Sequence, residues 1–131
     1  MLINIGLIGY GRWGKIIYKN LNKRNLNISI ATTQSRKFIL TNLKENSSIK
    51  LFKNYKLMLK NNQLDGLIIA SPPSTHEEIA IAALNLNIPV LIEKPIVMEL
   101  SGVTKIFDIA IKKKLPLFVD YMHLYSPFFI K

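Results

Sequence analysis

Cysteine is absent from the chain, and its absence excludes disulfide bonds, cysteine-ligated zinc or iron–sulfur sites, and catalysis by a thiol. Long apolar runs are also absent: no segment approaches the length of a membrane span, and no basic region precedes a signal-like apolar segment at the N-terminus. The 131 residues, 49% of them hydrophobic, suffice for one domain with its own core. We therefore expect a single-domain, cytoplasmic protein with no membrane association.

Acidic residues are few, with 8 Asp and Glu against 18 Lys and Arg, so the formal net charge is +10. Such a balance can indicate nucleic-acid binding, because basic side chains neutralise phosphates. Arginine is scarce, however, with only Arg12, Arg24 and Arg36, and the lysines are spread over the predicted helices without interleaved aromatic residues. This pattern favours a solvated lysine surface over a nucleic-acid partner, and attraction of an anionic cofactor or substrate is a further alternative.

Apolar runs alternate with amphipathic segments along the chain, which predicts alternating strands and helices. We expect strands at residues 2–8, 28–33, 49–52, 67–70, 89–92 and 115–121, and helices at 13–21, 35–46, 55–60, from 74 onward and at 99–114. Six such strands predict an α/β, Rossmann-type doubly wound parallel sheet in a single domain, with the strand order 3-2-1-4-5-6 and a crevice beside strands 1 and 4.

Two of these helices carry further signals. Ser74 with Glu77, and Thr75 with Glu78, have the spacing of a capping box and predict that a helix begins there. The helix at 99–114 has its apolar residues on one stripe, which comprises Val103, Ile106, Phe107, Ala110 and Ile111.

The segment Gly9-Tyr10-Gly11-Arg12-Trp13-Gly14 joins the first strand to the first helix. In this context Gly9 allows the tight turn, Gly11 lets a pyrophosphate approach the backbone, and Gly14 lets the helix pack close to the strand. The phosphates would lie at the helix N-terminus, where free N–H groups and the dipole favour negative charge. The alternative is a glycine-rich turn without a ligand.

Right-handed crossovers place the carboxyl ends of all six strands at one edge of the sheet. The segments at that edge are residues 9–14, 32–37, 71–76, 93–95 and 121–125, and they contain most of the unusual residues of the chain. This convergence supports a ligand site more strongly than any single motif does.

The second of these segments, Thr32-Thr33-Gln34-Ser35-Arg36-Lys37, has no carboxylate for the ribose hydroxyls of NAD. Hydroxyl groups together with Arg36 and Lys37 suit a 2′-phosphate, so NADP is favoured over NAD. The alternative is an ordinary polar start of a helix.

Histidine occurs twice, as His76 and His123, and neither has a carboxylate at ligand spacing, so the sequence predicts no metal site. His76 falls in the first turn of a predicted helix at the crevice. It is either a solvent-facing residue at the helix start or a residue that contacts the cofactor through a ring nitrogen.

Glu93-Lys94-Pro95 follows an apolar strand at the same edge. Charged residues there often only mark a loop. Alternatively, Lys94 could bind a substrate hydroxyl, stabilise a developing alkoxide or act as an acid or base, with Pro95 fixing the turn.

These motifs, with Asp65-Gly66-Leu67-Ile68-Ile69-Ala70-Ser71-Pro72-Pro73-Ser74-Thr75-His76 between them, occur in an order that resembles the N-terminal nucleotide-binding domain of the Gfo/Idh/MocA oxidoreductases, the glucose–fructose oxidoreductase and inositol dehydrogenase group. The resemblance covers essentially the whole chain. It implies an NAD(P)-dependent oxidoreductase acting on a sugar, polyol or sugar nucleotide. A non-catalytic dinucleotide-binding module, such as a sensor or subunit, is the alternative.

The resemblance also implies roles for individual residues. Gly9, Gly11, Arg12 and Trp13 would hold the pyrophosphate, with Gly14 in the same motif, and Thr33, Ser35 and Arg36 would meet the adenosine ribose or its phosphate. The dinucleotide would be lined by Ser71, Pro72 and His76. Glu93 would lie near the nicotinamide ribose, with Lys94 as the catalytic lysine beside the nicotinamide.

The family resemblance further implies a second, substrate-binding α/β domain. We expect residues 1–121 to form the dinucleotide-binding domain and residues 122–131 to begin the link to a substrate domain that this sequence lacks. The apolar Phe128-Phe129-Ile130 would then be uncovered, which predicts a homo-oligomer or a partner chain at this end.

Overall fold

The computed structural model describes residues 2–42, 49–61 and 63–121. Within them, the strands are β1 (Ile3–Ile8), β2 (Leu26–Ala31), β3 (Lys50–Phe52), β4 (Gly66–Ile69), β5 (Val90–Glu93) and β6 (Leu117–Asp120). The helices are α1 (Arg12–Leu21), α2 (Arg36–Asn42), α3 (Tyr55–Asn61), the 3-10 helix η1 (Pro73–Thr75), α4 (His76–Asn85) and α5 (Leu100–Lys113). Most bounds fall within one or two residues of the predicted ones. The predicted continuation of the second helix over 43–46, and the terminal segment 122–131, lie outside the described residues.

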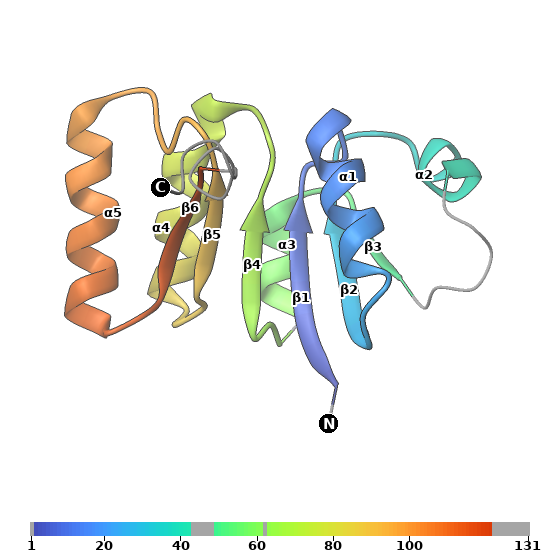
Figure 1. Cartoon of the computed structure of the whole chain (residues 1–131), viewed down its shortest axis with the longest axis horizontal. Helices are drawn as coiled ribbons and strands as arrows, with labels where there is room; N and C mark the ends of the chain where they lie inside the picture. Colours follow the sequence, from blue (N-terminus) through green and yellow to red (C-terminus); the bar gives the residue numbers. More distant parts are fainter. Residues whose placement is uncertain (1, 43–48, 62, 122–131) are drawn as a thin grey trace, which may run out of the picture.

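The strands form one parallel sheet in the order β3-β2-β1-β4-β5-β6, as predicted (Figure 1). Leu7 in β1 pairs with Ile30 on one side and with Ile68 on the other. All carboxyl ends therefore lie at the upper edge in Figure 1. The strand order reverses between β1 and β4, which is where ligands bind in doubly wound sheets.

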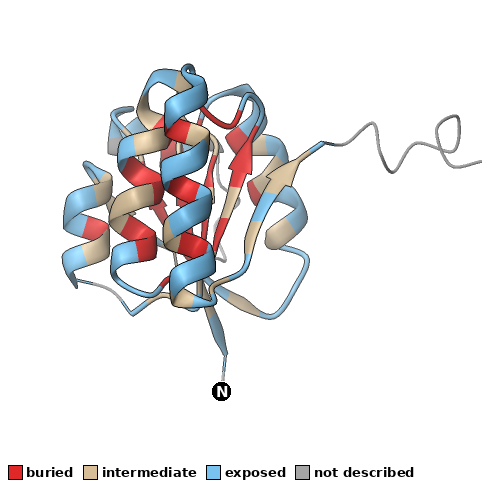
Figure 2. Ribbon diagram, turned by 90° about the vertical axis from the view of Figure 1, so that its left-hand side faces the viewer, coloured by how far each residue is buried: buried red, intermediate tan, exposed pale blue. Residues whose placement is uncertain are grey.

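Helices cover the sheet on both faces, and each face has its own hydrophobic cluster among the described residues. Leu7 belongs to the cluster that includes Tyr18 of α1, whereas its neighbour Ile8 belongs to the cluster that includes Ile79 of α4. Successive strand residues point to opposite faces, which explains this division. Figure 2 shows the buried residues gathered between helices and sheet. Packing of helices on both faces of the sheet holds the loops at its upper edge in place.

The helix predicted to begin at residues 74–78 is present, but the capping-box hydrogen bonds do not form. The chain first makes the 3-10 turn η1, α4 begins at His76, and no side-chain hydrogen bond caps it. The Thr75 hydroxyl instead donates to the Pro72 carbonyl at 2.7 Å. Two consecutive prolines lack N–H groups and have a fixed φ, which favours a tight turn before the helix.

The residues predicted to form an apolar stripe do lie in α5, but only part of the stripe is buried. Ile106 and Ala110 are buried, but Phe107 is 39% and Ile111 71% exposed. One residue along a helix is a rotation of about 100°, which turns these two side chains away from α4. With 14 residues, α5 is the longest described helix, and no helix in the described ranges is long and apolar enough to cross a membrane.

Candidate functional site

A cavity of about 580 Å³ opens at the carboxyl ends of β1, β2 and β4. Four loops contribute to its wall. They supply residues 9–13, residues 32–34, residues 53–55, and residues 70–72 together with Thr75 of η1 and the α4 positions 78 and 79. The crevice predicted beside the first and fourth strands is therefore present as a cavity of a size suited to a small-molecule ligand.

The three motif glycines have different surroundings. Gly9 has a φ of +92°, and a Cβ there would lie 2.5 Å from the Ala70 carbonyl oxygen. A Cβ at Gly14 would lie 2.1 Å from the Gly9 carbonyl oxygen, whereas one at Gly11 would meet nothing within 4 Å. Gly9 and Gly14 thus permit the turn and the close helix packing, and Gly11 leaves open space at the cavity.

The N-terminus of α1 faces the cavity, and no side chain of the described residues caps its free N–H groups. Gly11 is the N-cap residue, no side chain of the described chain caps the helix, and the first turn holds no acidic residue. The first-turn N–H groups have no intrahelical acceptors, and the helix dipole adds positive potential. Arg12 and Trp13 line the cavity beside them. An anion is the ligand that this arrangement can bind.

The loop after β2 divides its residues between two cavities. Thr33 lines both the main cavity and an adjoining one of about 480 Å³, whereas Ser35 lines only the adjoining one. The Ser35 hydroxyl accepts the Phe38 N–H at 3.2 Å and so stabilises the start of α2. The side chain of Arg36 lies outside the described parts of the structure.

Residues 53–55 also line the main cavity, and sequence reasoning missed them. They follow β3, which pairs with β2, so their loop reaches the same edge of the sheet. The predicted strand order already placed the end of the third strand beside that of the second, but no sequence motif in residues 53–55 pointed to a ligand site. Lys53 lines both cavities, as Thr33 does, and adds a positive charge there.

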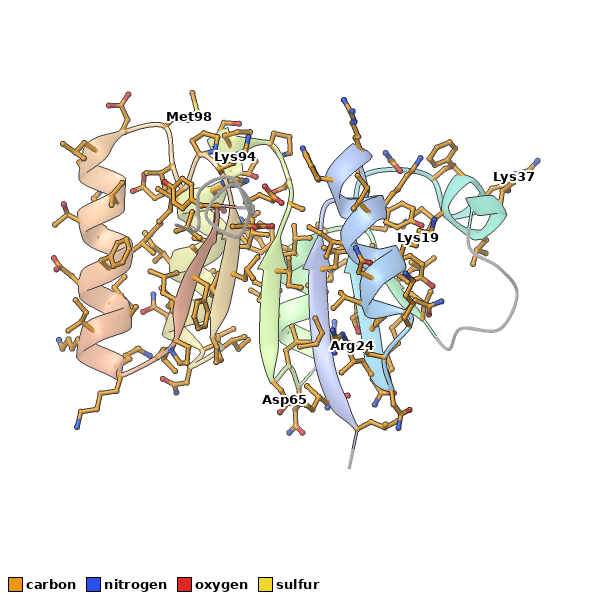
Figure 3. The ribbon with its side chains drawn as sticks, in the orientation of Figure 1. Lys19, Arg24, Lys37, Asp65, Lys94 and Met98 are labelled. Atoms are coloured by element: carbon orange, nitrogen blue, oxygen red, sulfur yellow. The ribbon has the colours of Figure 1, made fainter. Side chains whose placement is uncertain are left out.

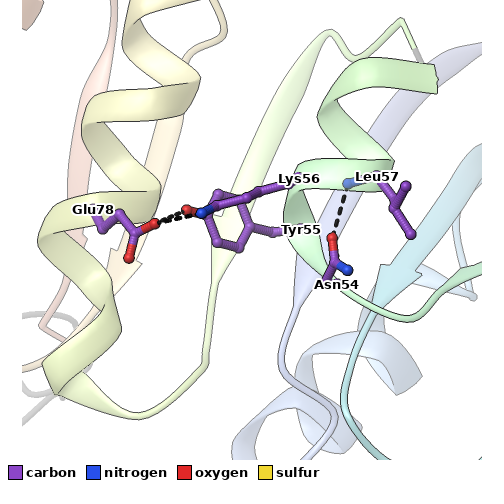
Figure 4. Close-up of polar contacts among 5 residues, drawn as sticks. All are labelled: Asn54, Tyr55, Lys56, Leu57 and Glu78. Atoms are coloured by element: carbon purple, nitrogen blue, oxygen red, sulfur yellow. Dashed lines mark hydrogen bonds and ion pairs between the residues drawn. The ribbon is translucent and has the colours of Figure 1, made fainter.

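A polar bridge joins α3 to α4 at the cavity wall (Figure 4). The Tyr55 hydroxyl donates to Glu78 Oε1, and Lys56 Nζ lies 3.2 Å from the same oxygen. Burial, and then the hydrogen bond and charge of Glu78, raise the pKa of Tyr55 to about 12. The same contacts, first with Tyr55 and then with Lys56, lower the pKa of Glu78.

We predict that Glu78→Gln returns the pKa of Tyr55 toward 10.0, because it removes the carboxylate that disfavours the tyrosinate. In the unchanged chain the raised pKa contributes stability below pH 10, and this contribution is lost as the pH rises toward 12. The pKa of Tyr55 is measured from tyrosinate absorbance against pH, after subtraction of the same titration of the Tyr55→Phe variant. Glu77→Gln is the matched control, because Glu77 pairs with Lys105 at 3.1 Å instead. Equal titration of both Gln variants would contradict the prediction.

The loop after β4 brings Ser71 and Pro72 to the cavity, but His76 points elsewhere. The His76 side chain is only 1% exposed. Its Nε2 lies 2.8 Å from the Ser71 carbonyl oxygen and its Nδ1 lies 3.0 Å from that of Pro95. Neither sequence interpretation, a solvent-facing histidine or a ring nitrogen directed at the cofactor, describes this geometry. His76 follows the turn at Pro72 and Pro73 as the first residue of α4, and its ring is directed inward.

Glu93 and Lys94 lie at the same edge of the sheet but do not line the cavity. Lys94 is exposed and lies at the upper edge in Figure 3, opposite to Asp65. Glu93 is buried and stands beside Asp120 in the register of β5 and β6. Burial, and then the Asp120 carboxylate, raise the pKa of Glu93, while the Lys94 main-chain N–H and charge act in the opposite direction. Glu93 and Asp120 thus place two carboxylates at the carboxyl ends of β5 and β6.

Known proteins share this sequence pattern. The chain is 28% identical over 120 residues to the myo-inositol 2-dehydrogenase of Thermotoga maritima, which is 91% of this chain and 36% of that protein. It is 27% identical over 123 residues to the rhizopine catabolism protein MocA of Rhizobium meliloti, covering 94% of this chain and 38% of that protein. The chain thus spans little more than a third of the length of these relatives.

A solved structure shares the fold. The scyllo-inositol dehydrogenase from Lactobacillus casei, solved with NAD(H) and scyllo-inositol, matches with a TM-score of 0.85 and 23% identity, over 97% of this chain and 38% of that one. The sequence profile of the Gfo/Idh/MocA oxidoreductases, described as an oxidoreductase family with an NAD-binding Rossmann fold, matches residues 3–121. This chain therefore belongs to the Gfo/Idh/MocA oxidoreductase family.

Proposed function

We propose that this chain is the cofactor-binding part of an NAD(P)-dependent oxidoreductase that acts on a sugar, polyol or sugar nucleotide. The observation that carries the proposal is the uncapped N-terminus of α1, which faces a cavity of about 580 Å³ beside the open position of Gly11. These features fit a dinucleotide, because its pyrophosphate needs both anion-binding N–H groups and close approach to the backbone. Family membership and the inositol dehydrogenases among the relatives support the activity and the substrate class.

In this proposal the pyrophosphate binds at Gly9, Gly11 and the first turn of α1, with Arg12 and Trp13 beside it. The adenosine end lies toward Thr33, Ser35 and Arg36, and Ser71 and Pro72 form the opposite wall. When bound, the nicotinamide ring supplies or accepts the hydride. Lys94, exposed at the adjoining loop, would bind a substrate hydroxyl and stabilise developing negative charge on its oxygen, with Glu93 near the nicotinamide ribose.

We propose further that NADP binds more tightly than NAD. Residues 32–37 contain no carboxylate to accept ribose hydroxyl groups, and Lys53 lines the same two cavities as Thr33. A lysine ammonium at this position would pair with a 2′-phosphate, which NAD lacks. Lys53 adds to the Arg36 and Lys37 charges that the sequence places in the neighbouring loop.

Titration with NADPH and NADH tests the cofactor site, because Trp13, the only tryptophan, lines the cavity. We expect both nucleotides to quench its fluorescence, NADPH at lower concentration. Lys53→Gln should weaken NADPH binding by about 10-fold and leave NADH binding unchanged, because a single charged hydrogen bond is worth roughly that factor. Lys60→Gln, at the end of α3, is the matched control. No response to either nucleotide would refute the cofactor site, and equal losses for both would refute the assignment of Lys53.

The substrate side belongs to the same proposal. Residues 1–121 act as the dinucleotide-binding domain, and residues 122–131 begin the link to the polypeptide that binds substrate. Reduction of NAD(P) that depends on an added polyol or sugar would support the oxidoreductase. Nucleotide binding without such reduction would favour a dinucleotide-binding module.

A further inference from the structure

His76 lies between two loops with different roles in the proposed function: the loop after β4 lines the cofactor cavity, and the loop after β5 carries Lys94, which would bind the substrate. It is the first residue of α4, and its side chain is 1% exposed. One ring nitrogen contacts the carbonyl of Ser71, in the loop after β4, and the other contacts that of Pro95, in the loop after β5. Both loops lie at the upper edge of the sheet in Figure 1. The ring thus connects positions 19 and 5 residues away along the chain.

The chemistry of these contacts has a fixed direction. A carbonyl oxygen can only accept a hydrogen bond, so the imidazole must donate. A neutral ring donates through one nitrogen and an imidazolium through both, which means that the ring always holds at least one of the two loops. A buried polar group of this kind is costly to leave without its partner. An imidazolium therefore hydrogen-bonds both loops at once, whereas a neutral ring hydrogen-bonds one loop and packs against the carbonyl of the other.

The loop that contains Ser71 is also fixed by side-chain hydrogen bonds of its own. Ser71 Oγ and Thr75 Oγ1 lie 2.7 Å apart, and Thr75 Oγ1 donates to the Pro72 carbonyl at 2.7 Å. The wall that Ser71 and Pro72 contribute to the cavity is thereby fixed against the start of α4. The contact of His76 with the Pro95 carbonyl then links this fixed wall to Pro95, the residue that directly follows Lys94.

We propose that His76 is a positioning residue, which sets the backbone of Lys94 at a defined place relative to the cofactor cavity. Lys94 is exposed, so the placement of its ammonium group depends on where its backbone is held. The proposal rests on the proposed function for the role of Lys94, but the coupling of the two loops through His76 can be tested without any nucleotide.

Hydrogen–deuterium exchange on the 131-residue chain tests the coupling. His76→Phe keeps a ring of similar shape and removes both donors. We expect amide exchange to rise about 10-fold in the 93–97 segment and in the 71–75 segment, while the 26–31 strand stays unchanged. His76→Gln retains an amide donor and should restore part of the protection. Uniform acceleration in all segments, or none in 93–97, would overturn the proposal. If the Phe variant does not fold, the Gln variant is compared with the unchanged chain by the same criterion.

Nucleotide binding supplies a second readout. NADPH reaches the Lys94 loop in the proposed site, whereas adenosine 2′,5′-bisphosphate carries only the adenosine end. His76→Phe should weaken NADPH binding by about 10-fold and leave the bisphosphate unaffected, with partial rescue in His76→Gln. Equal losses for both ligands would contradict positioning at the nicotinamide end. If the unchanged chain binds neither, the proposed function fails, and the exchange measurement alone decides whether His76 couples the loops.

Discussion

Gly14→Ala should lower the free energy of unfolding by about 3 kcal/mol or more, because the added methyl group has no space to occupy. Its Cβ would lie 2.1 Å from the Gly9 carbonyl oxygen and 2.9 Å from the carbonyl carbon. Both atoms belong to backbone, which cannot move aside as the end of a flexible side chain can. Relief would require α1 to shift away from the end of β1. Urea unfolding followed by circular dichroism measures the loss.

Gly11→Ala is the matched control for this substitution. The same methyl group at Gly11 would meet nothing within 4 Å, and its φ of −76° suits alanine. Alanine is a poorer N-cap than glycine, but it also restricts the unfolded chain, and these opposing effects are each about 1 kcal/mol or less. Stability should therefore change little, while affinity for a dinucleotide should fall because the methyl group occupies the space proposed for the pyrophosphate. Equal stability of the two variants would contradict the packing role of Gly14.

Arg12→Ala should weaken NADPH binding by about 10-fold or more, whereas Arg24→Ala should leave it almost unchanged. Both side chains are exposed, and both substitutions lower the net charge equally. Arg12 lines the cavity in the first turn of α1, whereas Arg24 lies in the turn between α1 and β2, at the other end of the sheet. A charged hydrogen bond to a phosphate contributes roughly 1.5–3 kcal/mol. Calorimetric titration of both variants measures the difference.

The stability of the Arg12 variant provides an independent check. A cation at a helix N-terminus opposes the helix dipole, so Arg12→Ala should leave the free energy of unfolding unchanged or raise it by a few tenths of a kcal/mol. The position is therefore unfavourable for the free protein and favourable when an anion is present. Similar loss of affinity in both arginine variants would indicate a general charge effect and would contradict a phosphate contact at Arg12.

The strand order and the glycine motif could be predicted from the sequence because each depends on local patterns. Apolar runs and helical periodicity mark the elements, and alternation of the two leaves few topologies. The roles of Gly9 and Gly14 follow from the step from strand to helix, and the structure gives both the expected close contacts. The predicted capping boxes show the limit of such signals, since Ser74 and Thr75 have the right spacing but the preceding prolines favour a different turn.

Three features of the site were decided only by tertiary structure. Lys53 reaches the cavity because β3 pairs with β2, Glu93 meets Asp120 because of the register of β5 and β6, and His76 turns inward to two distant carbonyls. Each joins residues that no sequence period relates. The sequence by itself determined the Rossmann-type sheet and the glycine-rich, uncapped N-terminus of α1, because backbone conformation and burial depend on nearby residues. The part of the cavity wall that Lys53 supplies and the contacts of His76 depend on pairings across strands and loops, which exist only once the chain has folded.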